Sequence, residues 1–180
     1  PSGCLPPHEV DHILTGGEEI SVGHLTLRTI ATPGHTAEHV CFLTPDGDLF
    51  TGDTILGAGT TTIFPPDGDM SDYMCSLERL RTIAPRRILP GHGPIREDAA
   101  ELIAYYIAHR LEREAQILSA LNRPSTVTAL RESIYPDLQP ALHQAAEVQL
   151  SAHLIKLARE GRVRDDSGIF SLSRNPPRPV

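Results

Sequence analysis

The period of the hydrophobic pattern changes near Pro94, and this change constrains the fold more than any other feature of the sequence. Before Pro94, short apolar runs of strand length are separated by turn residues, and one helical segment interrupts them. After Pro94, apolar residues recur at intervals of three and four, as on the buried face of a helix. We therefore expect an α/β chain of two domains, residues 1–95 and residues 96–180.

The first domain is expected to be a sheet with one helix. The alternation around Gly23 predicts a hairpin, and Ser71 has the side chain of an N-cap at the start of the helical segment. The elements predicted here are a hairpin over 19–30, paired strands over 40–44 and 49–51, a helix over 71–83 and a strand over 87–89.

The second domain is expected to be helical, with a hairpin at its end. The expected order is helix, helix, helix, hairpin, which is the order of a winged-helix module. Ser125 or Thr126 would cap the short helix, and Gly161 would stop the last one. The predicted elements are helices over 97–121, 127–134 and 140–160 and a hairpin over 162–172.

Composition limits the partners. The 180 residues have a formal net charge of −7, which disfavours sequence-independent nucleic-acid binding. The third helix of the second domain has mixed charge, so duplex DNA is a disfavoured partner and a structural role is favoured. Three cysteines without a CxxC motif indicate a reduced, cytoplasmic setting. No apolar run approaches the roughly 20 residues that span a bilayer, so no membrane association is expected.

Three loops carry the side chains that can bind a metal. Each follows a predicted strand, and in each a glycine precedes the candidate: Gly34 before His35, Gly52 before Asp53 and Gly91 before His92. A glycine lets the backbone turn sharply beside a ligand. Imidazole and carboxylate donors together suit zinc, iron or manganese. The three loops therefore indicate a metal site, although any one of these histidines alone is better explained as a surface or hydrogen-bonded residue.

The Thr-Pro-Gly-His-Thr, Gly-Asp and Gly-His-Gly loops resemble, in order and spacing, the later motifs of the metallo-β-lactamase superfamily. The resemblance implies an αββα sandwich of which this chain holds the C-terminal half, followed by the small winged-helix-like domain. It also implies two zinc ions in a longer parent protein. His35 and His92 would each complete the ligand set of one ion, and Asp53 would bridge both.

Residues 55–62 and 72–77, together with the helical tail, resemble the β-lactamase-like endoribonuclease subgroup, whose layout some thioesterases share. The resemblance implies a metal-dependent hydrolase in which a metal-bound hydroxide attacks a phosphodiester of single-stranded RNA or a small-molecule ester or thioester. The acidic charge weighs against RNA, and no basic cluster indicates a glutathione thioester.

The family's principal motif, His-x-His-x-Asp-His, is absent from this sequence, and only 34 residues precede His35. We therefore expect this truncated chain to bind metal weakly or not at all, to contain no certain catalytic residue and to be inactive alone. Two alternatives stay open: a non-catalytic fragment or interaction module that forms a homo-oligomer through its uncovered sheet, and a winged-helix nucleic-acid binder.

Secondary candidates accompany the three loops. His39, four residues after His35, is either a second ligand or a residue that orients the loop, and the second interpretation is favoured. The segment 57–62 is either a substrate-side loop or a flexible connection. Cys41 and Cys75 are expected to be packing residues rather than nucleophiles.

Overall fold

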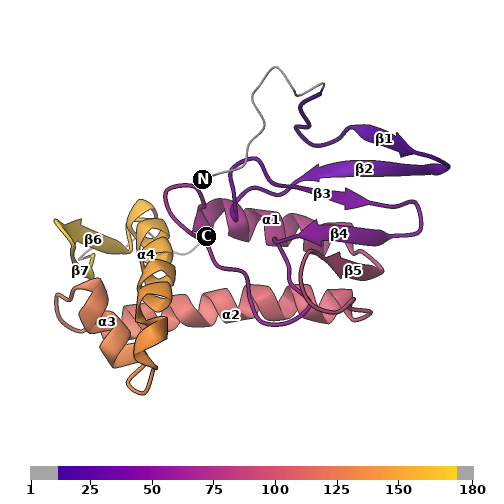
Figure 1. The fold of residues 1–180 in the computed structure, drawn as a ribbon. Coiled ribbons are helices and arrows are strands. Elements are labelled where there is room, and N and C mark those ends of the chain that lie inside the picture. The colour runs from indigo at the N-terminus through magenta and orange to yellow at the C-terminus, as the bar shows by residue number, and fades with distance from the viewer. Residues whose placement is uncertain (1–11, 174–180) are drawn as a thin grey trace.

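The computed structural model describes residues 12–173 and contains a mixed sheet, two helices against it, and a helical unit with a small hairpin (Figure 1). Neighbours along the sheet are antiparallel except β4 and β5, which are parallel because a helix connects them. In spatial order, the strands are β1 (Glu19–Val22), β2 (Leu25–Ala31), β3 (Val40–Leu43), β4 (Asp48–Gly52) and β5 (Arg87–Pro90). Both strand pairs predicted for the sheet, over 19–30 and over 40–51, are confirmed.

Helix α1 (Met70–Ile83) connects β4 to β5, but it begins one residue earlier than predicted and its cap differs. Asp69, not Ser71, is the N-cap. One carboxylate oxygen of Asp69 accepts hydrogen bonds from the backbone nitrogens of Ser71 at 2.8 Å and Asp72 at 3.1 Å. A carboxylate at this end of the helix also interacts favourably with the helix dipole.

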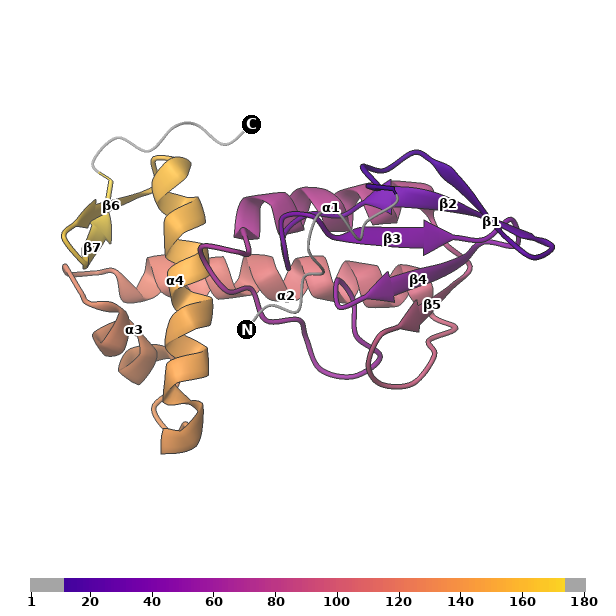
Figure 2. The ribbon, with the colours of Figure 1, turned by 45° about the horizontal axis from the view of Figure 1, so that its top comes forward.

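The C-terminal unit has the predicted winged-helix order (Figure 2). The predicted helix over 140–160 is divided in the structure into a 3-10 turn over residues 140–142, with Pro140 at its first position, and an α-helix that begins at His143. The elements are α2 (Ala99–Ala120), α3 (Val127–Ile134), the 3-10 turn η2 (Pro140–Leu142), α4 (His143–Arg159), β6 (Val163–Asp166) and β7 (Ile169–Leu172).

Two hydrophobic clusters hold the molecule together, and α2 contributes to both. The first lies between the sheet and the pair α1 and α2, with Leu49 and Ile88 of the strands packed near Tyr106 of α2. The second joins Ile117 of α2 to α3, α4 and the hairpin β6–β7. The boundary at 95/96 therefore stays a prediction, since α2 lies just after it and packs on both sides.

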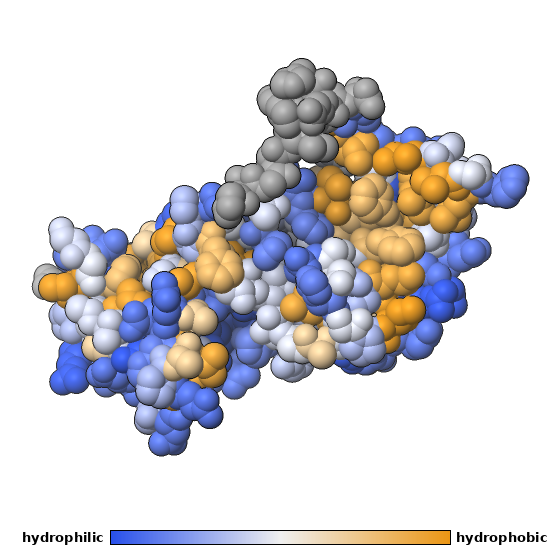
Figure 3. Space-filling model, in the orientation of Figure 1, coloured by the Kyte–Doolittle hydropathy of each residue, from blue (hydrophilic) through white to orange (hydrophobic). Residues whose placement is uncertain are grey.

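The opposite face of the sheet is apolar and exposed, as the half-sandwich prediction requires (Figure 3). Phe42 of β3 pairs with Phe50 of β4, and Phe50 keeps 39% of its surface exposed. Val22 and Leu25, which pair across β1 and β2, are 57% and 38% exposed. Among the described residues, these side chains form an apolar surface of the kind that a second layer covers. We call it the open sheet face.

Two smaller expectations concern Cys75 and membranes. Cys75 lies on the exposed side of α1, so the expectation that it packs in the core is wrong; its position in the helix turns it away from the buried row Tyr73, Ser76 and Leu77. Cys41 is fully buried, as expected. Over residues 12–173, no helix has the length and apolar character needed to cross a bilayer.

Candidate metal centre

The three predicted metal-binding loops meet at one edge of the sheet. Strands β2, β4 and β5 run in the same direction, since β2 and β4 are each antiparallel to β3 and β5 is parallel to β4. Their carboxyl ends therefore lie at the same edge, and each is followed by one candidate: His35, Asp53 or His92. Strand order alone thus brings together residues that are far apart in the sequence.

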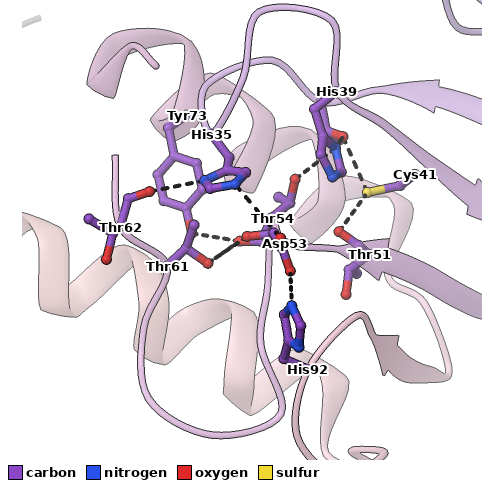
Figure 4. A network of polar contacts seen from close by, with 11 residues as sticks. His35, His39, Cys41, Thr51, Asp53, Thr54, Thr61, Thr62, Tyr73 and His92 are labelled. Carbon is purple, nitrogen blue, oxygen red and sulfur yellow. Dashed lines mark hydrogen bonds and ion pairs between the residues drawn. The ribbon is translucent and has the colours of Figure 1, made fainter. Parts of the chain in front are cut away.

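Asp53 lies between the two histidines (Figure 4). Its Oδ2 is 3.8 Å from His35 Nε2, and its Oδ1 is 3.5 Å from His92 Nε2. The His92 side chain is 78% exposed, the Asp53 side chain 40% and the His35 side chain 25%. The carboxylate thus presents one oxygen to each imidazole at an open surface.

The hydrogen bond on the far side of the His35 ring indicates what its Nε2 can do. His35 Nδ1 lies 3.0 Å from the backbone oxygen of Thr62, which can only accept, so Nδ1 carries the hydrogen. In the neutral ring Nε2 is then an acceptor, and it faces an Asp53 oxygen that is also an acceptor. A cation between them satisfies both. Metal-binding histidines have this arrangement, with one ring nitrogen donating to a carbonyl and the other free for the ion.

The donors are arranged as two pairs rather than as one cluster. Within residues 12–173, no group of three or more histidine, cysteine or acidic side chains has the geometry to hold one metal ion. His35 and His92 instead face different oxygens of Asp53. The donor chemistry fits zinc, but each pair supplies two ligands where a catalytic zinc commonly takes three from protein. A complete site would need ligands from outside the described residues.

His39 connects the first two loops. Its Nδ1 is 2.8 Å from the hydroxyl of Thr32, which follows β2, and 3.0 Å from the hydroxyl of Thr54, which follows β4. Burial, together with the nearby His35, lowers the pKa of His39, while Asp53 opposes the shift. These contacts agree with the favoured interpretation that His39 orients the loops.

Two of the glycines are needed where they stand. Gly34 has φ +133°, and a Cβ there would come within 2.3 Å of the Tyr73 Cα. Gly52 has φ +49°, in the left-handed region, and a Cβ there would lie 2.7 Å from His39 Nε2. These two glycines therefore allow close contact with neighbouring groups as well as a turn.

Sequence reasoning missed the residues that hold the loop between β4 and α1. The Thr61 hydroxyl lies 2.7 Å from the Asp53 carbonyl oxygen, and the Tyr73 hydroxyl donates to the Thr54 carbonyl at 2.6 Å. Burial raises the pKa of Tyr73 to about 12, so its hydroxyl stays protonated as a donor. The segment 57–62 is therefore a well-anchored loop rather than a flexible connection. The only sequence signal for these contacts was the unusual length of the loop.

Cys41 is next to this network but is not a nucleophile. Its thiol lies 3.2 Å from the Thr32 hydroxyl. Burial raises the pKa of the thiol to about 11, which keeps it in the unreactive protonated form. The expectation that Cys41 packs rather than reacts agrees with this position.

Two family models match the chain. Residues 5–92 match the Metallo-beta-lactamase superfamily, and residues 126–171 match the Beta-lactamase associated winged helix domain. The first match covers the sheet and all three loops. The second covers α3, α4 and the hairpin β6–β7.

Similar proteins agree with both matches. The chain is 38% identical over 157 residues to a Beta-lactamase-like protein 2 homolog of Caenorhabditis elegans, covering 86% of this chain and 52% of that protein. It is 36% identical over 116 residues to an Atrochrysone carboxyl ACP thioesterase of Aspergillus fumigatus, covering 64% of this chain and 36% of that protein. The relatives thus include a protein named as a thioesterase.

A solved structure gives the same fold. A metallo-beta-lactamase family protein from Thermus thermophilus superposes with a TM-score of 0.77 at 26% sequence identity, over 88% of this chain and 53% of that chain. The chain thus spans about half the length of the Caenorhabditis elegans relative and of this structure.

Proposed function

Because the chain belongs to the metallo-beta-lactamase superfamily and carries a beta-lactamase-associated winged helix domain, we propose that it supplies half of a dinuclear metal site in a hydrolase. The proposal depends on one observation: the two oxygens of Asp53 face two different imidazole nitrogens, at 3.8 Å and 3.5 Å. This arrangement suits a carboxylate that bridges two ions. His35 and His92 would each bind one of them, and zinc is the metal that their chemistry favours.

When bound, a pair of zinc ions supplies a Lewis acid and lowers the pKa of water. The residues of this chain prepare the place for that chemistry. The Thr62 carbonyl fixes the proton of His35 on Nδ1 and leaves Nε2 as a donor to metal. The Thr61 hydroxyl donates to the backbone oxygen of Asp53, which fixes the backbone from which the carboxylate extends at the end of β4. Because the His92 side chain is exposed, a substrate could reach the site from solvent.

We propose an acyl thioester as the substrate. A relative 36% identical to this chain is named as a thioesterase, and a net charge of −7 does not favour a polyanionic substrate. Single-stranded RNA is the competing substrate and is part of the test. A cytoplasmic location remains part of this proposal.

The open sheet face supports the proposal that this chain alone is inactive. In an αββα sandwich that face packs on a second sheet, and the missing ligands would come from the same side of the fold. The same surface supports the alternative of a self-associating module, since exposed apolar faces promote pairing. Light scattering over a range of concentrations separates these two, because only the self-associating module becomes larger as concentration rises.

Zinc titration of the purified chain tests the site. We expect weak binding that Asp53→Asn weakens at least about tenfold, because the bridging carboxylate loses its charge. The matched control is His24→Gln, which changes an exposed histidine at the β1–β2 turn and should leave binding unchanged. Equal binding by Asp53→Asn and the unchanged chain would contradict the site.

A protein extended to the length of the relatives tests the substrate. We expect it to hydrolyse an acyl thioester and to lose this activity with Asp53→Asn. Cleavage of single-stranded RNA without thioester hydrolysis would contradict the thioester proposal and make RNA the substrate. Salt-dependent binding of duplex DNA would favour the winged-helix alternative instead.

A further inference from the structure

Three consecutive backbone carbonyls in the loop between β4 and α1 each accept a hydrogen bond from a different part of the molecule. The middle one, on Thr62, accepts from His35 Nδ1 at 3.0 Å. The one before it, on Thr61, accepts from Arg110 Nη2 of α2. The one after it, on Ile63, accepts from Gln149 Nε2 of α4 at 2.9 Å. The outer two carbonyls thus bond to the helices, and the middle one bonds to His35.

The two outer donors also hold each other. Arg110 Nη1 donates to Gln149 Oε1 at 3.1 Å, so one arginine and one glutamine form a single unit across α2 and α4. Arg110 is 3% exposed, and its guanidinium lies 5.3 Å from the centre of the Tyr73 ring. We call this unit the Arg110–Gln149 clamp. Because an arginine in this position has little access to water, its hydrogen bonds to the loop have strongly preferred geometry.

The loop needs such support because it has no secondary structure of its own. Residues 61–63 form neither helix nor strand, yet Thr61 and Ile63 are 2% and 0% exposed. Buried carbonyls without partners are costly, at about 1–3 kcal/mol each, so their donors determine how the segment lies. The clamp supplies these donors on one side, and the carbonyl of Thr62 is left facing the other side.

We propose that Arg110 and Gln149 are positioning residues for His35, through which the helical unit sets the proton of the candidate metal ligand. By fixing the carbonyls on either side, the clamp holds the Thr62 oxygen where it accepts from His35 Nδ1. The Nε2 lone pair is thereby directed at Asp53. Gln149 lies within the part of the chain that matches the winged helix domain. The role of the clamp in metal binding rests on the proposed function, but the hydrogen bonds themselves are those of the protein without metal.

The test is the tautomer of His35 in the metal-free chain. Long-range proton–nitrogen NMR of the ¹⁵N-histidine-labelled protein distinguishes a hydrogen on Nδ1 from one on Nε2. The measurement compares the two neutral tautomers of the ring. His35→Gln identifies the signal. We expect the unchanged chain to hold most of His35 in the Nδ1–H form.

Gln149→Met removes both polar atoms of the clamp side chain at similar size. We expect the Nδ1–H form of His35 to fall from the majority to a minority, because free imidazole favours the hydrogen on Nε2. Gln144→Met, at an exposed position of the same helix, is the matched control and should change nothing. Urea unfolding checks that each variant is folded. If Gln149→Met does not fold, Gln149→Glu keeps the acceptor for Arg110 and removes the donor to Ile63.

An unchanged His35 tautomer in a folded Gln149 variant would overturn the inference. A zinc titration of the same samples separates it from the proposed function. If zinc binds, Gln149→Met should weaken it about tenfold, at the lower end of the effect of indirect ligand contacts. If the tautomer responds but Asp53→Asn leaves zinc binding unchanged in a protein extended to the length of the relatives, the positioning role stands and the metal proposal fails.

Discussion

Glu114 lies in the middle of a buried group of charges between α2 and α4, and its removal should strongly destabilise the fold. Its carboxylate is 3% exposed. Oε1 is 2.9 Å from Lys156 Nζ and 3.6 Å from His153 Nδ1, and Oε2 is 3.6 Å from Arg162 Nη1. We predict that Glu114→Met lowers the free energy of unfolding by about 3 kcal/mol.

The magnitude follows from what is left behind. Removing one partner of a buried ion pair costs about 3–5 kcal/mol, because the other charge loses its compensation. After Glu114→Met, Lys156 is still 2.6 Å from Glu160, and Arg162 is 40% exposed and can turn to water. The expected loss therefore lies at the lower end of that range. For a chain of this length it corresponds to a fall of about 6–12 °C in Tm.

The double variant Glu114→Met with Lys156→Met sharpens the prediction. Replacing both members of a buried pair by apolar side chains of similar volume is often neutral, so the double variant should be more stable than Glu114→Met by at least about 1 kcal/mol. Urea unfolding followed by circular dichroism measures all the stabilities. A loss below about 1 kcal/mol in Glu114→Met, or additive losses in the double variant, would refute the reasoning.

Two further predictions concern the buried His153 and the left-handed glycine Gly52. Burial lowers the pKa of His153 below its ordinary 6.5; Arg110 contributes to the lowering and Glu114 opposes it. Below about pH 6.5 the unfolded chain therefore binds more protons than the folded chain, and the free energy of unfolding falls. Urea midpoints measured from pH 7 to pH 5 (roughly the range where histidine titrates) should fall less steeply in His153→Gln, and an equal slope would contradict this role. Gly52→Ala should cost about 1–2 kcal/mol from its left-handed backbone alone, and more because its Cβ meets the His39 ring. A thermal melt within 1 °C of the unchanged chain (roughly a few tenths of a kcal/mol) would disprove the strain.

Most of the local structure could be predicted because it depends on neighbours in the sequence. The hairpin turn at Gly23 follows from a short pattern, and the structure confirms it. Of the two candidate caps Ser125 and Thr126, the structure has Thr126. The predicted N-cap of α1, Ser71, is wrong because Asp69, two residues earlier, can also cap a helix. A serine and an aspartate both accept such bonds, and only the path of the chain selects Asp69.

The candidate site could be predicted only as far as its motifs reach. His35, Asp53 and His92 follow three glycines, and strand direction then brings them to one edge. The supporting residues have no such signal. Arg110 and Gln149 stand on helices with ordinary amphipathic patterns, and their contacts with 61–63 depend on how α2 and α4 pack. Contacts of this kind arise from tertiary structure, which no local pattern contains.

Helix α2 makes the molecule hard to divide. Its first half, with Tyr106, completes the cluster beneath the sheet, and its second half, with Ile117, completes the cluster of the helical unit. A cut at 95/96 would take the first half away from the sheet, and a cut after α2 would take the second half away from the helical unit. Each piece would therefore expose core side chains, so the whole should unfold in a single cooperative transition. Exchange of either unit between relatives would have to carry this helix, or match its faces on both sides.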